Sequence, residues 1–375
     1  MHSALEKYLT QSLAGIRVLD LSTSASGAWC SRLLADFGAD VVMLEGPEGH
    51  PLRHEPPFDA DGSGIAAGLF LANKRSIQLD LRSTAGKATM LGLARGADVV
   101  VSGFRPSGLS ALGLDYSAFE NQRLVLCHVT PFGMTGSRAE DAANELSVAA
   151  LSGWASLNGD AGRTPLKPSG HQVAFCTGTA AYGAIVGALI HRDANAGLGQ
   201  EIDVAELDVM VSASSPAILR GQYLGVPASR RQAVDITTGP VPIRDGHFAL
   251  TISRAHFWRD AMNVLGLHDL AEDPRWETSW YRNAHKDEYT ARVGEAMSSW
   301  TKAELFEELA LRRVVAGPVL TMEELRNSEH LADRGFWATL GEDAYPGPPF
   351  QMSETPAKLR APAPIAGASE AAWKA

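Results

Sequence analysis

The sequence predicts an α/β protein built around a doubly wound parallel sheet. In the N-terminal half, short runs of β-branched and other apolar residues alternate with helical patterns, which is typical of consecutive βα units. The strands look buried, as strands covered by helices on both faces are. We expect five such strands, at residues 16–21, 41–44, 76–81, 98–101 and 124–129.

The segments between and after these strands have helical spacing. Trp29, Leu33, Leu34 and Phe37 recur three and four residues apart, and Gly38 follows as a helix end. Residues 178–192 are small and apolar on all sides, which predicts a buried helix rather than an amphipathic one. Three more elements are expected: a helix at 85–95, a strand at 201–204 and a helix at 206–219.

A change in composition after residue 223 indicates a second domain. Pro, Gly and Arg interrupt the chain there, and a hairpin is predicted at 241–252 with its turn at Asp245-Gly246. Apolar residues at helical spacing then predict helices at 259–266, 284–300 and 302–312. Residues 345–364 are Pro-rich, so we expect them to run extended over the surface.

Composition and charge exclude several classes of protein. The 375 residues contain 33 Lys and Arg against 43 Asp and Glu, a net charge of -10, which disfavours binding to nucleic acid. The N-terminus lacks a basic region followed by an apolar one, so we expect no secretory signal and a cytoplasmic protein. The apolar run 180–189 ends near His191, from which no membrane span is expected. Three scattered Cys and dispersed His predict neither disulfides nor a metal site.

Common nucleotide and hydrolase motifs are missing from the sequence. The turn at 22–27 holds one glycine, Gly27, where the dinucleotide-binding pattern GxGxxG needs three. The sequence also has no GxxxxGK[ST] for nucleoside triphosphates and no GxSxG nucleophile elbow. NAD-dependent, phosphate-loop and serine hydrolase chemistries are therefore excluded as first hypotheses.

Basic residues flank two of the predicted strands. Asn73, Lys74 and Arg75 precede one strand, and Arg105 follows another, so we expect three cations near one sheet edge, where α/β folds collect ligands. Lys and Arg at that edge could bind the phosphates of an adenine nucleotide tail. The alternative is that Lys74 and Arg75 are a solvated lead-in to the strand.

An ordered series of short motifs resembles the family III CoA-transferases. The segment ADFGADVVMLE at 35–45 follows the first strand and turn, and FGMTG occupies 132–136. Each motif is short, but their common order covers roughly residues 13–337. The remaining matches lie at 73–81, 104–114, 150–153, 197–203, 273–276 with 282–283, and 316–319.

The resemblance implies a protein that handles coenzyme A thioesters without a metal. Its fold would be a large Rossmann-like domain and a smaller α+β domain, with two chains interlocked like links. Residues 1–222 and 323–375 would together form the large domain, and 223–322 the small one. Asn73, Lys74, Arg75 and Arg105 would contact CoA. The expected partners are acyl-CoA or free CoA and a second chain, either identical or homologous.

The sequence departs from the family at its catalytic position. The family's transferases attack the donor thioester with an Asp that lies four residues before a Gly, ahead of the buried helix. Counting back from Gly178 reaches Ala174, whose methyl group cannot attack a thioester. The His of the family's racemases would fall near Asn144.

Three hypotheses follow from this departure. The chain could be the non-catalytic subunit of a heteromeric CoA-transferase, paired with a homologous chain that brings the Asp. It could instead act alone through another group, such as Cys176 with His171 as its base, or the carboxylates of Asp160 or Glu145. In the third hypothesis it binds CoA or serves a structural purpose without chemistry.

Overall fold

The computed structural model describes residues 11–226, 228, 230, 239–252, 255–341 and 343–374. The chain divides into two compact units. The large unit comprises residues 1–158, 166–228 and 332–375, and the small unit comprises 159–165 and 229–331. The predicted domain boundaries lay at 222/223 and 322/323, and the sequence did not indicate that 159–165 belong to the small unit.

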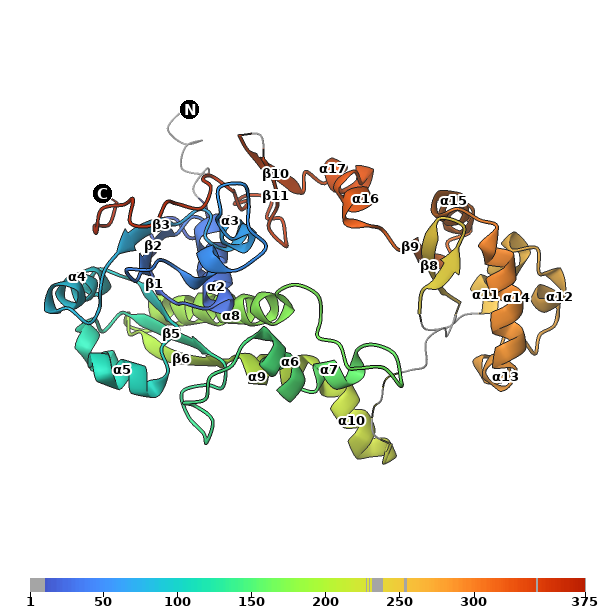
Figure 1. Cartoon of the computed structure of the whole chain (residues 1–375), viewed down its shortest axis with the longest axis horizontal. Coiled ribbons are helices and arrows are strands. Elements are labelled where there is room, and N and C mark those ends of the chain that lie inside the picture. Colours follow the sequence, from blue (N-terminus) through green and yellow to red (C-terminus); the bar gives the residue numbers. More distant parts are fainter. Residues whose placement is uncertain are drawn as a thin grey trace. The chain divides into compact units, whose positions relative to one another are not determined.

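A six-stranded sheet forms the centre of the large unit (Figure 1). Every strand pair in it is parallel, and the strand order is β3-β2-β1-β4-β5-β6. The order reverses between β1 and β4, as in other doubly wound sheets, so the predicted parallel sheet is confirmed. The strands are β1 (Arg17–Leu21), β2 (Asp40–Glu45), β3 (Arg75–Gln78), β4 (Val99–Ser102), β5 (Val125–Thr130) and β6 (Gln200–Ala205).

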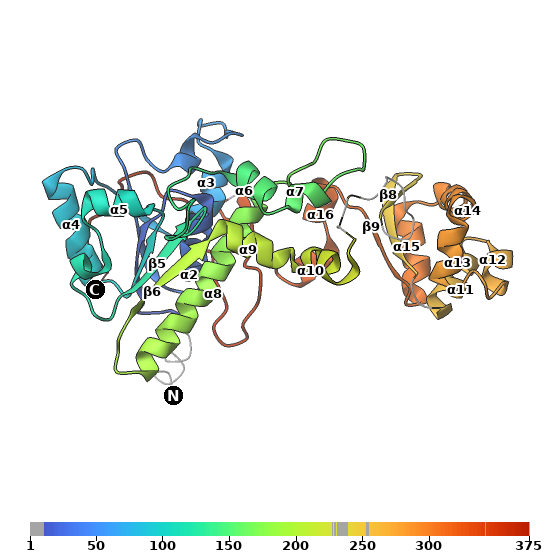
Figure 2. The ribbon, with the colours of Figure 1, turned by 90° about the horizontal axis from the view of Figure 1, so that it is seen from below.

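Helices cover both faces of the sheet because its strands are apolar on both sides. Helices α2 (Ala25–Asp36) and α8 (Gln172–Ala194) pack on one face, where Leu34 and Ile185 join Val18 in one apolar cluster. Helix α4 (Thr84–Arg95) packs on the other face, where Leu93 meets the alternate strand residues. Figure 2 shows α2 and α8 beside the sheet. The large unit also contains α3 (Ile65–Phe70), α5 (Pro106–Leu112), α6 (Glu145–Leu151), α7 (Trp154–Leu157), η1 (Pro51–His54) and η2 (Tyr116–Phe119).

Helix α8 is longer than the helix predicted at 178–192. It begins at Gln172 rather than Gly178 and lies close against α2, since a Cβ at Gly178 would stand 2.5 Å from the Ser26 carbonyl oxygen. Residues 173–190 carry no charged side chain, and by length and composition alone α8 could cross a membrane. The expectation that no run is long enough for a span was therefore wrong, because it counted only 180–189.

The helix predicted at 206–219 is two helices. Helix α9 (Glu206–Ala213) ends at Ser214, and α10 (Ser215–Leu224) begins directly after it. Pro216 lies in the first turn of α10. Backbone N–H groups in the first turn have no acceptor within the helix, so the missing N–H of proline costs no hydrogen bond there. A proline at this position starts a new helix rather than continuing the preceding one.

The C-terminal segment, residues 356–374, runs without helix or strand along the large unit. Its backbone is tied to the start of β3 and to α2: Ser369 N donates to Ser76 O, and Lys358 N donates to Asp36 O. Trp373 Nε1 donates to Leu93 O at the end of α4. An antiparallel pair, β10 (Trp337–Leu340) and β11 (Asp343–Pro346), precedes the segment.

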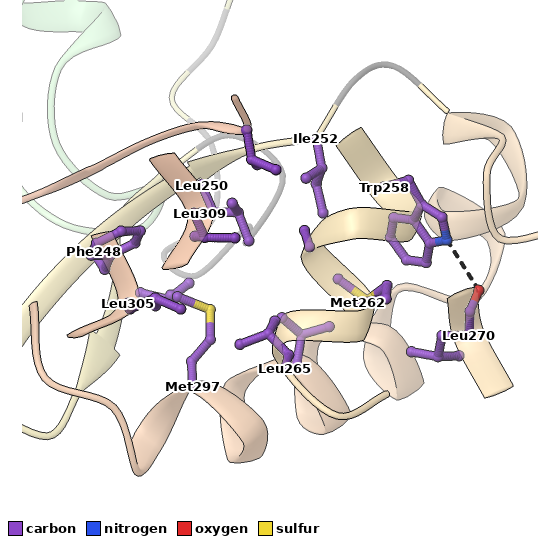
Figure 3. Close-up of a cluster of buried hydrophobic side chains, with 14 of the residues drawn as sticks. Phe248, Leu250, Ile252, Trp258, Met262, Leu265, Leu270, Met297, Leu305 and Leu309 are labelled. Carbon is purple, nitrogen blue, oxygen red and sulfur yellow. Dashed lines mark hydrogen bonds between the residues drawn. The ribbon is translucent and has the colours of Figure 1, made fainter. Parts of the chain in front are cut away.

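The small unit packs helices on a three-stranded antiparallel sheet of order β7-β8-β9. Its apolar cluster includes Phe248, Met262 and Leu305, and Trp258 Nε1 donates to Leu270 O at 3.0 Å (Figure 3). The predicted hairpin is present, but β9 was not expected. The elements are β7 (Val241–Ile243), β8 (Gly246–Thr251), β9 (Val315–Pro318), α11 (Ala255–Val264), α12 (His268–Glu272), α13 (Ser279–Ala284), α14 (Lys286–Ser298) and α15 (Lys302–Leu311); α16 (Met322–Arg326) and α17 (Glu329–Asp333) follow.

Candidate active site

Position 174 lies in the first turn of α8 and is enclosed by apolar side chains. Ala174 is 1% exposed and belongs to the cluster that contains Trp29 and Phe70. The neighbouring Phe175 ring meets the edge of Trp29 at 4.9 Å and stacks on Phe70 at 5.3 Å, measured between ring centroids. The methyl group at this position therefore completes an apolar surface.

The Glu145 side chain, on helix α6, binds the start of α8. Glu145 is the first residue of α6, and its Oε1 accepts a hydrogen bond from Val173 N at 2.8 Å. This satisfies one of the backbone N–H groups that the first turn of a helix leaves unpaired. Asn144 caps α6, since its side chain accepts from Ser147 N. The Glu145 side chain thus caps the N-terminus of α8 at Val173, the residue before Ala174.

A second carboxyl, Glu206, is buried in the same region, and sequence reasoning missed it. Glu206 is the first residue of α9, is 7% exposed, and its Oε1 accepts from Ser26 Oγ at 2.5 Å. Burial raises its pKa; the Ser26 hydrogen bond opposes the rise, and the charge of Glu145 adds to it. No ion pair to Glu206 occurs among the described residues. A buried carboxyl without a cation is a common feature of functional sites.

Ser26 and Glu206 lie beyond the carboxyl ends of two strands of the sheet. Ser26 is in the first turn of α2, which follows β1, and Glu206 follows β6 directly. Ligands of open α/β sheets bind in the crevice at this edge. The sequence signal for Glu206 was its place immediately after the buried end of a parallel strand.

Cys176 is half-buried in a small apolar cluster with Val148, Val173 and Met210. Burial raises the pKa of its thiol, and the charge of Glu145 raises it further. A nucleophilic cysteine needs the opposite shift. His171, the predicted base, packs edge-on against Phe70 at 5.2 Å, and in the part of the chain that the structure describes no hydrogen bond joins it to Cys176.

Asp160 belongs to the small unit, whereas Ala174, Glu145 and Cys176 belong to the large one. Its side chain is 42% exposed, and an oxygen lies 3.9 Å from Arg163 Nη1. The Asp160 carbonyl oxygen accepts from Arg230 Nε. Its carboxylate is thus a partly exposed loop charge.

The ammonium group of Lys74 is enclosed rather than open to a ligand. Its side chain is 0% exposed, and Nζ donates to Asp20 Oδ2 at 3.1 Å and to Ala28 O at 2.9 Å. Burial lowers the pKa of Lys74, and Asp20 opposes this shift. For Asp20, burial raises the pKa, but Lys74 and hydrogen bonds from Ser22 and Ser31 outweigh it and hold the pKa below its ordinary value. An enclosed, paired ammonium does not fit the predicted contact with a phosphate.

Asn73 and Arg75 are occupied by partners within the chain. Arg75 Nε and Nη2 donate to the two Asp40 oxygens at 3.0 and 2.7 Å, and Nη1 donates to Ala372 O. Asn73 Nδ2 donates to Asp36 Oδ1 and to Lys358 O. Two of these partners, Lys358 and Ala372, belong to the C-terminal segment, which runs beside the amino end of β3.

Arg105 is the one predicted cation at the carboxyl edge of the sheet. It follows β4, is exposed, and its Nη1 donates to Glu140 O at 2.6 Å. The prediction that all these cations share one edge was wrong, because residues that precede a parallel strand and residues that follow one lie at opposite edges. The predicted CoA contact of Arg105 stays a prediction.

A cavity of about 800 Å³ begins beside Arg105. Pro106, the next residue, lines it together with Leu109 and Met134, and His128 and Glu201 contribute polar groups. This volume lies within the range of small-molecule and cofactor sites. Within the described ranges, no group of three or more His, Cys, Asp or Glu side chains could hold a metal ion.

Comparison with known proteins identifies the family. The model of CoA-transferase family III matches residues 13–370. The succinate–glutarate CoA-transferase of Agrobacterium fabrum is 34% identical over 96% of this chain and 94% of its own length. Subunit BbsE of the succinyl-CoA:(R)-benzylsuccinate CoA-transferase of Thauera aromatica is 32% identical over 95% of this chain and 92% of its own.

The solved structures agree with this assignment. A CAIB/BAIF family protein from Brucella suis superposes with a TM-score of 0.87 at 29% identity and covers 96% of this chain and 97% of that one. The fold, the order of motifs and the two curated relatives therefore lead to one conclusion. The chain belongs to CoA-transferase family III, whose members transfer CoA between an acyl-CoA thioester and a carboxylic acid.

Proposed function

We propose that this chain is the non-catalytic subunit of a heteromeric family III CoA-transferase and that a homologous chain supplies the attacking Asp. The observation that carries the proposal is the buried methyl group of Ala174, at the position where the resemblance leads us to expect the family's nucleophile. A relative of similar length is named as a subunit rather than as a complete enzyme, which supports the same assignment.

In the proposed enzyme the partner's Asp attacks the carbonyl carbon of the donor acyl-CoA. A C–O bond forms, the C–S bond breaks, and CoA leaves as the thiolate, so that a mixed anhydride remains. The thiolate then attacks the anhydride at the Asp carbonyl and releases the donor acid. The acceptor carboxylate next displaces CoA from the aspartyl thioester, and CoA finally attacks the acceptor's own carbonyl. No oxidant or metal is consumed.

For this chain the proposal assigns structure and binding rather than covalent chemistry. Interlocked chains would each need the other to complete the assembly, which suits a pair in which one member has lost its nucleophile. Arg105 and the cavity beside it would hold the phosphate-bearing end of CoA, since Arg105 is exposed at the carboxyl edge. Lys74 would stabilise the sheet through Asp20 instead of binding CoA.

The test begins with the complex isolated from the host by a tag on this chain, followed by native mass spectrometry and peptide identification. We expect a heteromer that contains a homologous chain with Asp at the position of Ala174. The purified chain alone should not exchange CoA between succinyl-CoA and a panel of carboxylic acids, whereas the reconstituted pair should. Turnover by the pure chain alone would overturn the proposal.

The second candidate is a stand-alone enzyme, and Glu206 is the observation that favours it. Its carboxyl is buried and interacts with Glu145 near position 174, and among the residues that the structure describes Ser26 is its one hydrogen-bond partner. If the pure chain is active, Glu206→Gln should abolish that activity and Cys176→Ala should leave it within about twofold. In the heteromer, both substitutions should leave turnover within about twofold, because the partner's Asp does the chemistry.

A further inference from the structure

A basic cavity lies at the amino-terminal edge of the large unit's sheet, opposite the edge that holds Ala174 and Arg105. Its volume is about 480 Å³. Arg17, the first residue of β1, lines it, as does Arg123, which precedes β5. Arg95 at the end of α4 and Lys374 in the C-terminal segment complete the set of cations.

The two carboxylates in this cavity are already neutralised from outside it. Asp98 Oδ1 accepts from the buried Arg192, and its Oδ2 accepts from Arg17 N. Asp40 is bound by two nitrogens of Arg75 and also accepts from Lys374 N. Neither Arg75 nor Arg192 lines the cavity. The charges of Asp40 and Asp98 are therefore balanced by Arg75 and Arg192, and they do not balance the charges of the cations that line the cavity.

Two of those cations have acidic partners elsewhere, and two have none. Arg95 pairs with Glu120 at 2.8 Å, and Arg123 lies 3.6 Å from Asp193. The Arg17 guanidinium and the Lys374 ammonium make no hydrogen bond or ion pair with any residue that the structure describes. Six cations thus face four carboxylates, and the excess of two positive charges resides on Arg17 and Lys374.

The carbonyl groups at the end of α4 do not oppose an anion here as strongly as a free helix end would. Asn121 Nδ2 donates to Ala97 O at 2.8 Å and, at 3.3 Å each, to the carbonyl oxygens of Ala94 and Arg95. These hydrogen bonds occupy acceptors at the negative end of the helix dipole. Among the described side chains that line the cavity, those of Arg17 and Lys374 remain as donors without a partner.

We propose that this cavity binds a small dianion between Arg17 and Lys374. The two uncompensated charges match an anion of charge two, and a planar guanidinium suits phosphate or carboxylate oxygens in bidentate geometry. Inorganic phosphate, a phosphate ester and a dicarboxylate all have this chemistry. The site is separate from the proposed CoA site, and a bound dianion would join the C-terminal segment to the start of β1.

The test measures binding to the full-length chain by isothermal titration calorimetry at constant ionic strength. Inorganic phosphate, ADP and succinate are titrated separately into the wild type, into the double variant R17Q/K374Q and into the control R82Q. Arg82 is an exposed cation, 81% accessible, that pairs with Asp80 and does not line the cavity. Hydrogen exchange of residues 369–373 is followed with and without each anion.

We expect at least one of the three anions to bind and to slow exchange in residues 369–373. The double variant should weaken that binding by about tenfold or more, because one hydrogen bond between charged groups is worth about that much, while R82Q should match the wild type. The preferred anion identifies the source of the charge: phosphate alone, a phosphate ester or a dicarboxylate.

Two results would overturn the proposal. In the first, none of the three anions binds the wild type at millimolar concentration. In the second, the double variant binds as tightly as the wild type, which would assign the binding to another surface such as the CoA site. Thermal unfolding without ligand must coincide for all three proteins, and single variants R17Q and K374Q replace the double variant if it does not. Neither outcome depends on whether the chain is catalytic.

Discussion

The Glu145 carboxylate accepts the backbone N–H of Val173 at 2.8 Å, so the first residue of α6 caps α8 one residue before Ala174. The start of α8 is therefore held by a side chain from another helix. Four helices, α2, α6, α8 and α9, begin in this region, through Ser26, Glu145, Val173 and Glu206 respectively. Hydrogen bonds therefore join the start of α2 to the start of α9 and the start of α6 to the start of α8.

Glu145→Ala should lower the free energy of unfolding by about 1 kcal/mol, the usual effect of removing a side chain that caps a helix N-terminus. The loss follows because Val173 N would lack its acceptor. Urea denaturation measures it. Glu48→Ala, which removes an exposed carboxylate, is the matched control and should stay near the wild type. Equal stability of the two variants would contradict the capping assignment.

Lys74→Met should destabilise the large unit by about 3–5 kcal/mol, because it leaves Asp20 buried without its cation. Chemical denaturation gives the size of the effect. The double variant Asp20→Asn/Lys74→Met removes both charges and should recover a substantial part of the loss. The single variant Asp20→Asn completes the comparison. If the destabilisation of the double variant equals the sum for Asp20→Asn and Lys74→Met, the two groups are not energetically coupled.

Glu206→Gln should make stability less dependent on pH. Burial raises the pKa of Glu206 above its ordinary value of 4.5 in the folded state, with Ser26 opposing and Glu145 adding to the shift. The folded chain thus keeps a proton that the unfolded chain releases, and wild-type stability falls as pH rises from about that value through the folded pKa. The stability difference between Glu206→Gln and the wild type should therefore grow with pH and then level off.

Urea titrations between pH 4.5 and pH 8 follow this difference. Glu145→Gln serves as a second variant, since removing the neighbouring charge should shift the wild-type curve to lower pH. A difference that is constant across the range would show that Glu206 has the same pKa folded and unfolded.

Cys176 should react slowly with iodoacetamide in the native chain at pH 8. Burial, with Glu145 as a further cause, raises the pKa of its thiol, so the thiolate fraction is small. We expect a rate roughly several-fold or more below that of glutathione, with mass spectrometry locating the label. Cys30 and Cys127 are buried and should react later still, and urea should expose all three thiols. Modification of Cys176 at the glutathione rate would contradict this.

The sequence was sufficient for the sheet because its signals are local. Runs such as 16–21 and 124–129 are apolar enough to require burial on both faces, and parallel strands joined by helices then follow. The early start of α8 was not predicted because its first turn is stabilised by Glu145, a contact between residues distant in sequence. Strand β9 was missed because its sequence, Val-Ala-Gly-Pro, has weak strand propensity. Its strand conformation depends on antiparallel pairing with β8, which is distant in sequence.

The site could be predicted only in part. Counting from Gly178 placed Ala174 just ahead of the buried helix, whereas the structure has it inside the first turn, because α8 begins at Gln172. Glu206 could not be found in this way because its burial depends on how α9 packs against α6 and α8. The basic residues were misplaced because residues that precede a parallel strand and residues that follow one were assigned to the same edge of the sheet, whereas they lie at opposite edges. The C-terminal residues that bind Asn73 and Arg75 lie 285 and 297 residues further along the chain.

The attachment of the C-terminal segment also constrains the order in which the protein can form during synthesis. Strand β3 and helix α2 emerge early from the ribosome, but Asn73, Ser76 and Asp36 receive their partners from residues near 358–369. In a nascent chain these groups on α2 and β3 therefore lack their C-terminal partners until the whole small unit has been translated. Domains usually fold as they appear; in this chain the first domain to begin is the last to be completed.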